Sequence, residues 1–180
     1  MKQNRDQLIN HLKSIVRNIP DFPQPGIQFK DITTILKDAQ ALQATSVLLS
    51  EPFKGMEIDY VIGLESRGFL MGPRLAQDLN AGFIPVRKPG KLPAKTIQTT
   101  YELEYGSGTL EIHADAVAPG DRVIIHDDLI ATGGSAYAAT ALVKQLKGEV
   151  AGYSFIMELK ELQGRKKLPS QVIIDILLAL

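Results

Sequence analysis

The sequence predicts an α/β fold with an open, mainly parallel sheet flanked by helices. Residues 122–148 have the pattern of a buried strand, a short loop and a helix, which is half of a βαβ unit. Residues 59–86 have the pattern strand, helix, strand, as expected for a parallel crossover. Two further segments rich in apolar residues, 150–157 and 172–178, supply the remaining strands.

The segment 122–135 is the centre of this pattern. Val123–Ile125 is a β-branched run, which is typical of a strand covered on both faces. After Ser135, apolar residues recur at helical spacing. We expect this helix to stop at Gly148, with Lys147 in its last turn.

The loop in this segment has the residues of a phosphate site. Thr132–Ser135 lies at the expected helix start, where unpartnered N–H groups and the helix dipole favour an anion. Asp127 and Asp128 precede it and suit the two hydroxyls of a ribose, an Mg²⁺ ion, or both. The alternative is a tight strand-to-helix turn with solvated aspartates. Neither a P-loop nor a dinucleotide-binding glycine motif occurs.

Composition limits the class of protein. The chain has 180 residues, 44% of them hydrophobic, so it is long enough for one domain with a sizeable core. Lys and Arg balance Asp and Glu at 20 each, which argues against a nucleic-acid partner. With no cysteine, disulfides and thiolate sites are excluded. Without an apolar signal core or a bilayer-length segment, we expect one cytoplasmic domain over residues 1–180 and no membrane partner.

The first fifty residues predict two helices and a stiff connection. A helix is expected over residues 5–17, followed by a proline-rich loop over 19–26 without regular structure. Residues 27–32 form either a linker or a lid that presents Ile27 and Phe29 to a flat apolar ligand. Asp38 is expected to cap a second helix that runs to about Ser50. Its expected buried side chains are Leu42, Val47 and Leu49.

A row of cations follows the next two strands. Strands are expected at 59–63 and 82–86, with a helix over 69–79 between them. Arg67 and the basic loop 87–95 would then lie at the carboxyl ends of parallel strands, where open α/β sheets bind ligands. This loop is either a solvated charge run or, together with Arg67, a pyrophosphate site.

A hairpin follows the basic loop. Residues 96–103 and 109–113 are expected as its strands, with a turn at 106–108. Its acidic and aromatic tip suits a flexible flap, near residues 95–113, over a site. Farther along the chain we expect a short helical turn at 158–163 and an exposed basic loop at 164–167.

Five separated motifs resemble the adenine phosphoribosyltransferases of the type I phosphoribosyltransferase family. Together the resemblance covers about residues 5–180. The motifs are Asp21-Phe22-Pro23-Gln24-Pro25-Gly26-Ile27-Gln28-Phe29-Lys30-Asp31-Ile32, Gly63-Leu64-Glu65-Ser66-Arg67-Gly68-Phe69, Arg87-Lys88-Pro89-Gly90-Lys91-Leu92-Pro93, Leu103-Glu104-Tyr105-Gly106 and the phosphoribosyl-diphosphate (PRPP) string from His126 to Ser135. Two positions depart from the family's usual residues: Thr34 replaces a common proline, and His126 replaces a common valine.

The resemblance implies an enzyme of purine salvage that makes AMP and pyrophosphate from adenine and PRPP, with Mg²⁺, as a homodimer. It implies that the ribose and 5′-phosphate are bound by Asp127, Asp128, Ala131, Thr132, Gly133, Gly134 and Ser135. It assigns pyrophosphate to Arg67, Arg87, Lys88, Lys91 and Tyr105, and adenine to Ile27, Phe29 and Lys30.

The same resemblance makes Glu104 the catalytic acid–base and gives His126 no catalytic role. It implies no dedicated metal site, because Mg²⁺ arrives with PRPP and would lie near Asp127. Within the single domain, residues 1–35 would form an N-terminal helix and base-binding hood, and residues 36–180 the core. The rivals are an enzyme for another base, such as hypoxanthine, guanine, xanthine or orotate, and a PRPP-binding regulator without catalysis.

Overall fold

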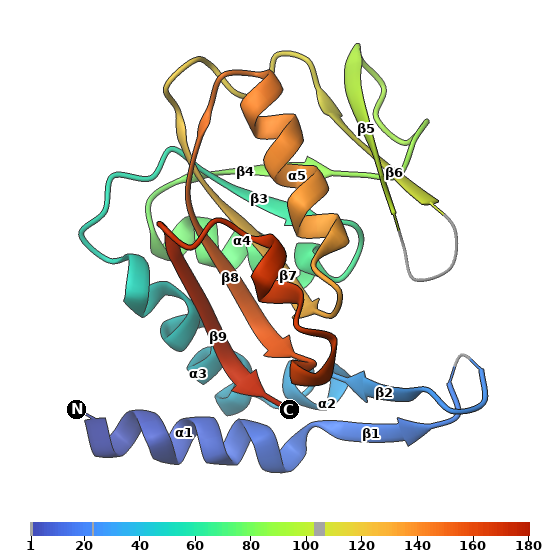
Figure 1. The fold of residues 1–180 in the computed structure, drawn as a ribbon. Coiled ribbons are helices and arrows are strands. Elements are labelled where there is room, and N and C mark those ends of the chain that lie inside the picture. Colours follow the sequence, from blue (N-terminus) through green and yellow to red (C-terminus); the bar gives the residue numbers. More distant parts are fainter. Residues whose placement is uncertain (1, 23, 103–106) are drawn as a thin grey trace. The chain divides into compact units, whose positions relative to one another are not determined.

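Five strands form one parallel sheet in the computed structural model, in the order β4-β3-β7-β8-β9 (Figure 1). Their bounds are β3 Tyr60–Leu64, β4 Gly82–Val86, β7 Arg122–Ile130, β8 Glu149–Glu158 and β9 Ile173–Ala179. The structure describes residues 2–22, 24–102 and 107–180. The predicted parallel α/β class is confirmed, and β7, the central strand, is the one with the β-branched run.

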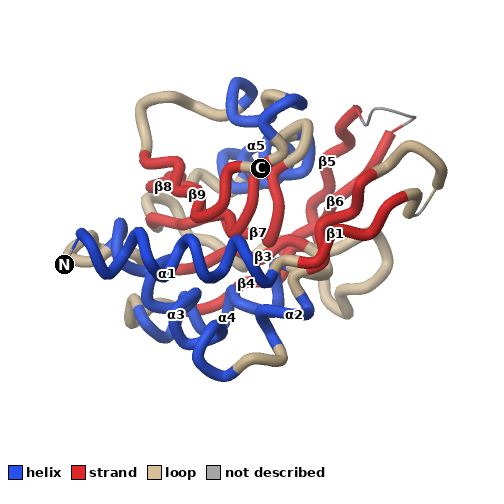
Figure 2. Tube along the Cα trace, turned by 90° about the horizontal axis from the view of Figure 1, so that it is seen from below, coloured by secondary structure: helices blue, strands red, loops and turns tan. Residues whose placement is uncertain are grey.

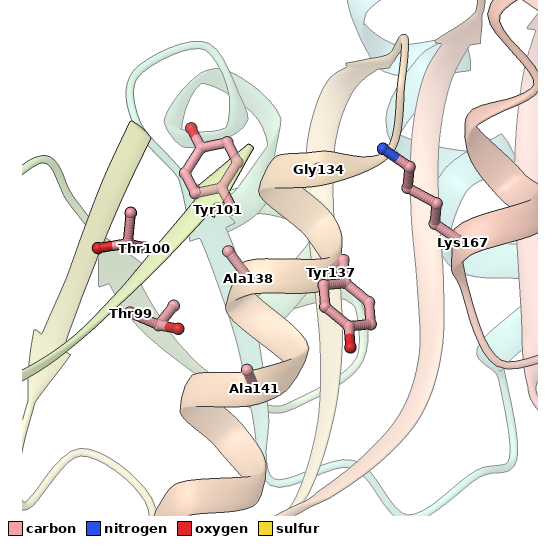
Figure 3. A pocket seen from close by; sticks show the side chains of 8 residues that line it. All are labelled: Thr99, Thr100, Tyr101, Gly134, Tyr137, Ala138, Ala141 and Lys167. Atoms are coloured by element: carbon pink, nitrogen blue, oxygen red, sulfur yellow. The ribbon is translucent and has the colours of Figure 1, made fainter. Parts of the chain in front are cut away.

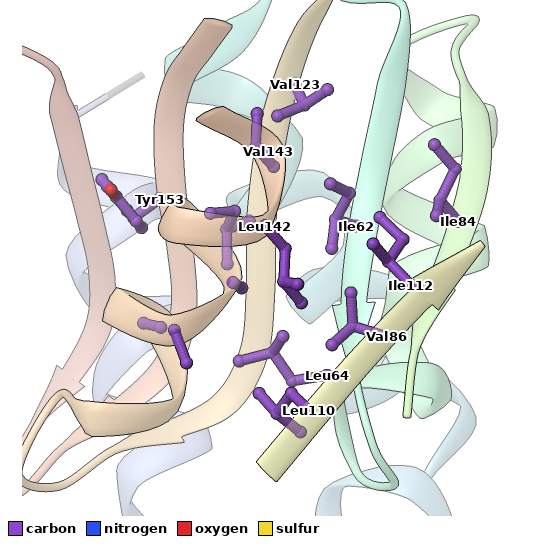
Figure 4. Packing of buried hydrophobic residues seen from close by; sticks show 14 of the residues in the cluster. Ile62, Leu64, Ile84, Val86, Leu110, Ile112, Val123, Leu142, Val143 and Tyr153 are labelled. Atoms are coloured by element: carbon purple, nitrogen blue, oxygen red, sulfur yellow. The ribbon is translucent and has the colours of Figure 1, made fainter. Parts of the chain in front are cut away.

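Helices cover both faces of this sheet. Figure 2 shows the strands between α5 (Gly134–Gln145) and α4 (Gly68–Asp78). Because side chains alternate along a strand, Ile62 and Leu64 of β3 pack on the α5 side while Gly63 lies against Phe83 on the other side. Figure 4 shows the apolar cluster on the α5 side, which includes Val123, Leu142, Val143 and Tyr153.

The ends of β7 and α5 differ from the sequence expectation. β7 continues to Ile130 and so includes both aspartates, whereas the sequence suggested that the strand ends at them. α5 ends at Gln145, so Lys147 lies beyond the last turn and adopts a φ of 65°. The N–H groups of Lys147 and Gly148 donate to the carbonyls of Lys144 and Val143, both at 3.0 Å, which is a Schellman motif with lysine in the position usually held by glycine.

Beside α5, the antiparallel hairpin of β5 (Thr96–Glu102) and β6 (Ser107–His113) confirms the predicted pairing. Its expected turn at 106–108 is wrong in part, because Ser107 and Gly108 are already in β6. An isolated bridge between Arg87 and Glu111 connects this hairpin to the segment after β4.

The segment after β8 is more ordered than expected. Two short 3-10 helices follow the strand, η2 (Lys160–Leu162) and η3 (Gly164–Lys167), while Glu158 still belongs to β8. The expectation of an exposed basic loop at 164–167 is wrong in part, because Gly164 is buried and Arg165 makes a two-pronged ion pair with Glu158. The Nε–Oε1 and Nη2–Oε2 distances are 2.9 and 2.6 Å.

Residues 1–48 and 49–180 form two units. The first begins with α1 (Lys2–Ile15) and the antiparallel pair β1 (Arg17–Pro20) and β2 (Gln28–Asp31). The expectation that residues 19–26 lack regular structure is wrong at Ile19 and Pro20, which pair with Phe29 and Gln28. Proline is tolerated there because it ends a strand of a two-stranded ribbon, where N–H donors are dispensable.

The division between the units falls within α3 (Ala39–Ser50), which follows the short helix α2 (Thr33–Leu36); η1 (Glu51–Phe53) comes next. Asp38 caps α3 as predicted, with Oδ1 2.9 Å from the N–H nitrogens of both Gln40 and Ala41. Leu49 is buried, but Val47 is 43% exposed, so its predicted burial is wrong. Within the described ranges, no helix has the length and apolar character needed to cross a bilayer.

Candidate active site

Two adjoining cavities lie at the carboxyl end of β7, and Asp127 lines both. The first has a volume of about 290 Å³ and is lined by Glu65, Ser66, Arg67, Lys88, Asp127 and Asp128. The second, of about 170 Å³, is bounded by the loop from Ala131 to Ser135 together with Asp127, Leu129 and neighbouring apolar residues. The predicted ribose, phosphate and pyrophosphate residues of β7 and β3 therefore meet at one edge of the sheet.

One arginine, Arg67, acts electrostatically on both aspartates. Asp128 is 2% exposed, and its Oδ2 lies 3.0 Å from the Nε of Arg67. Burial raises the pKa of Asp128, although the Arg67 charge opposes this. Burial, and then repulsion from Asp128, raises the pKa of Asp127 well above its usual value. A cation bound near the pair would favour the ionised form of both carboxylates, because its charge would offset the desolvation and the mutual repulsion.

The phosphate loop has the backbone that its glycines predict. Gly133 precedes α5 with a φ of 77°, a conformation that favours glycine, and has no side chain to cap the first N–H groups of the helix. Gly164 packs behind this loop: a Cβ on Gly164 would lie 2.2 Å from the carbonyl oxygen of Ala131 and 2.8 Å from the Gly133 nitrogen. Only a glycine at 164 lets the η3 turn approach the loop this closely. Sequence reasoning missed this contact.

Three of the basic residues predicted to bind pyrophosphate contact one carboxylate, Glu65, whose role sequence reasoning also missed. Glu65 accepts the N–H of Lys88 at 2.8 Å, lies 3.4 Å from the Arg87 Nε, and pairs with the Lys91 ammonium. Burial alone would raise the pKa of Glu65, but the hydrogen bonds from Lys91, Lys88 and Arg87 outweigh it and lower the pKa to about 2. Glu65 follows β3 and its peptide bond to Ser66 is cis.

The remaining predicted residues fall either outside the described residues or in the first unit. Glu104 and Tyr105 are outside the described residues. Ile27, Phe29 and Lys30 belong to the first unit, on or next to β2. There, Ile27 is 38% exposed, and the Phe29 ring packs edge-on against Phe22, with centroids 5.1 Å apart.

His126, next to the aspartates, is fully buried, and its Nδ1 lies 3.1 Å from the carbonyl oxygen of Ser154. Burial lowers its pKa to about 4, so the ring is neutral at physiological pH and packs inside the fold. The described part of the chain contains no group of three or more His, Asp or Glu side chains arranged to hold a metal ion.

Comparison with known proteins shows the family of this chain. The model of the phosphoribosyl transferase domain matches residues 28–173. Adenine phosphoribosyltransferase from Acidobacterium capsulatum is 55% identical over 166 residues, which cover 92% of this chain and 92% of the relative. The adenine phosphoribosyltransferase of Trichormus variabilis is 57% identical over 167 residues, covering 92% of this chain and 97% of the relative.

Solved structures give the same likeness in three dimensions. The crystal structure of adenine phosphoribosyltransferase from Rhodothermus marinus has a TM-score of 0.93 and 52% identity, covering 97% of this chain and 99% of that one. The Saccharomyces cerevisiae enzyme, complexed with an imino-altritol bisphosphate and adenine, has a TM-score of 0.89 and 45% identity, covering 96% of this chain and 99% of that one.

Proposed function

This chain belongs to the adenine phosphoribosyltransferases, and from that premise we propose which of its residues carry out the reaction. The reaction transfers the 5-phosphoribosyl group of PRPP to adenine and gives AMP and pyrophosphate, a step of purine salvage. The rival readings, a regulator without catalysis or an enzyme for another base, are not favoured, because relatives more than half identical over 92% of the chain are adenine enzymes.

Asp127 and Asp128 bind the ribose hydroxyls and stabilise the positive charge that develops on the sugar as pyrophosphate leaves. The support is their position at the 290 Å³ cavity and their shared burial, which makes a nearby cation favourable. Arg67 neutralises part of the charge of Asp128 and is one of the cations available to the leaving anion. This juxtaposition of a buried carboxylate pair with a phosphate loop is the observation that carries the proposal.

The 5′-phosphate is bound by the loop from Ala131 to Ser135. Its support is the uncapped start of α5, whose N–H groups and dipole favour an anion. The hydroxyls of Thr132 and Ser135 line the same cavity and can donate further hydrogen bonds. Pyrophosphate is bound by Arg67, Arg87, Lys88 and Lys91, with Tyr105 from the flap.

The residues present fit a magnesium ion that arrives with its substrate. Mg²⁺ prefers oxygen ligands and is commonly held by one or two carboxylates together with substrate phosphates, and Asp127 and Asp128 offer such oxygens beside the proposed pyrophosphate site. When bound, Mg²⁺ would neutralise charge on the leaving pyrophosphate. A dedicated all-protein metal site is not part of the proposal.

The base is held by Ile27, Phe29 and Lys30, and Glu104 handles the proton of the purine ring. The aromatic pair of Phe22 and Phe29 supports a role with flat rings, since it offers an apolar surface. The 1–35 hood and the 36–180 core, the homodimer and the cytoplasmic location remain part of this proposal; light scattering and cell fractionation test the last two.

The direct test is AMP formation from adenine, PRPP and Mg²⁺, with hypoxanthine and guanine in parallel. We expect turnover of adenine alone. Asp127→Asn and Glu104→Gln should each lose at least about a hundredfold in kcat while the fold, measured by circular dichroism, persists. Full activity in either variant would overturn that residue's role, and omitting Mg²⁺ should reduce turnover of the wild-type enzyme.

A further inference from the structure

Glu111 is a buried acid that the reaction as described does not use. It is 2% exposed and lies on β6, the second strand of the hairpin. Its Oε1 accepts the backbone N–H groups of Lys91 and Leu92, at 3.0 and 3.1 Å. Its Oε2 lies 3.1 Å from the Gln98 amide nitrogen and 3.3 Å from the Thr96 hydroxyl. One side chain thus receives donors from two separate segments.

These contacts fold the basic loop around a carboxylate. Arg87 and Glu111 also exchange both backbone hydrogen bonds, with N–O distances of 2.9 and 2.7 Å, so the start of the loop is fixed at the same residue. Burial alone would raise the pKa of Glu111, but backbone N–H groups of Lys91, Leu92 and Gly90 lower it, so the acid is ionised. The loop backbone therefore encloses a fixed negative charge.

The position of this loop sets the position of its cations. The Arg87 Nη1 donates to the Lys91 carbonyl oxygen at 3.3 Å, and both side chains pair with Glu65, which lines the 290 Å³ cavity. If the turn at 90–92 unwound, Lys91 would lose this direction, because its backbone is held by Glu111. The hairpin side of the same carboxylate, Thr96 and Gln98, connects the loop to the first strand of the flap.

We propose that Glu111 is a positioning residue for pyrophosphate: it holds the 87–92 turn so that Arg87 and Lys91 converge on the anion, and it couples this turn to the flap hairpin. This inference rests on the proposed pyrophosphate role of those two cations. Glu111 touches no substrate itself. It acts through Lys91 and Arg87, so its loss should weaken pyrophosphate binding and leave binding of AMP at the phosphate loop intact.

Titration calorimetry of the full chain with magnesium pyrophosphate, and separately with AMP, tests this. Glu111→Gln keeps the size of the side chain but turns an amide donor toward the donors of Thr96 and Gln98 or of the loop. We expect its Kd for pyrophosphate to rise about tenfold, which is about 1.4 kcal/mol, with the Kd for AMP within twofold of wild type. Glu149→Gln, the same change at an exposed position at the start of β8, should leave both constants unchanged.

Lys91→Ala and Arg87→Ala distinguish a failure of this inference from a failure of the proposed function. If they weaken pyrophosphate binding while Glu111→Gln does not, the inference fails and the proposed function stands. If neither alanine variant affects pyrophosphate, the proposed role of the loop fails and the inference falls with it. Equal weakening of AMP and pyrophosphate by Glu111→Gln would indicate general loosening and also overturn it.

Should Glu111→Gln not fold, Gln98→Met removes one donor from the hairpin side and keeps the acid. We expect it to weaken pyrophosphate binding by about threefold with AMP unchanged, since a single hydrogen bond to a charged group is lost. Unchanged pyrophosphate binding in a folded Gln98→Met protein would refute the coupling to the flap.

Discussion

The hydroxyl of Ser135 donates a hydrogen bond to the phenol oxygen of Tyr101, 3.2 Å away. Ser135 belongs to the phosphate loop and Tyr101 to the first strand of the flap hairpin, so one hydrogen bond connects the two. The ring of Tyr101 is held from behind, because a Cβ on its cross-strand partner Gly108 would lie 2.7 Å from the ring Cζ. In the free enzyme, this serine hydroxyl is thus already engaged.

Tyr101→Phe should strengthen binding of the 5′-phosphate. The variant retains the ring on Gly108 but frees the Ser135 hydroxyl to donate to phosphate. Since a typical hydrogen bond contributes about 0.5–1.5 kcal/mol, the Kd for AMP should fall about two- to tenfold by calorimetry. Tyr137→Phe is the matched control: Tyr137 lines the same cavity of about 430 Å³ as Tyr101 (Figure 3) but is 56% exposed. Weaker AMP binding in Tyr101→Phe would contradict the idea that Tyr101 and the phosphate compete for the Ser135 hydroxyl.

Gly164→Ala should damage the phosphate loop from behind. Its methyl group would collide with the backbone of Ala131 and Gly133, and such overpacking costs about 1–3 kcal/mol. We expect a lower Tm and at least about tenfold weaker AMP binding. Gly55→Ala is the comparison: its Cβ meets nothing within 4 Å, although its φ of 84° strains an alanine. That variant should lose stability and keep its AMP affinity; a similar loss of AMP affinity in both would refute local damage.

Glu65→Gln should make the free energy of unfolding less dependent on pH in the acid range. The pKa of Glu65 is about 2 in the folded protein and near its ordinary value when unfolded, so its contribution is complete above pH about 4.5 and disappears as pH falls toward 2. Lys91 is about half exposed, so screening limits the contribution to ~1 kcal/mol. Urea unfolding of both proteins at pH 7 and pH 3 measures it: the difference between them should shrink at the lower pH, and a constant difference would exclude this linkage.

Asp128→Asn should shift the pH dependence of PRPP binding. The charge of Asp128 is one cause of the raised pKa of Asp127, so removing it should lower that pKa. PRPP binding by the wild type should strengthen with rising pH as the pair ionises, and the midpoint of this change should move to lower pH in the variant. Binding measured from pH 4 to 8 by calorimetry reveals the midpoint. An unmoved midpoint would mean that another group controls the profile.

The sequence predicted those parts of the site that local chemistry determines. The β7 strand, the phosphate loop and α5 follow from a β-branched run, glycines and helical periodicity within one short segment. Asp38 was likewise predictable as a cap, because its partners lie two and three residues ahead.

The features that sequence reasoning missed depend on contacts between residues far apart in the chain. Glu111 and Lys91 are 20 residues apart, and Glu65 and Lys91 are 26 apart, so no local pattern marks these acids. Lys147 takes a conformation that residue preference assigns to its neighbour Gly148. The glycine at 148 serves close packing instead, since a Cβ there would meet Val117 at 2.5 Å. The prolines of residues 19–26 favour a loop without regular structure, and the pairing of Pro20 with Gln28 cannot be inferred from proline alone.

The close approach of Gly164 to the phosphate loop also has a consequence for biosynthesis. A ribosome makes the loop about thirty residues before it makes Gly164, and β9, which follows Gly164 in sequence, is made after the other strands of this sheet. A nascent chain that has emerged only as far as α5 contains the complete phosphate motif but lacks Gly164, which packs against it. Competence to hold a nucleotide should therefore arise late in translation, when the carboxyl-terminal strands dock.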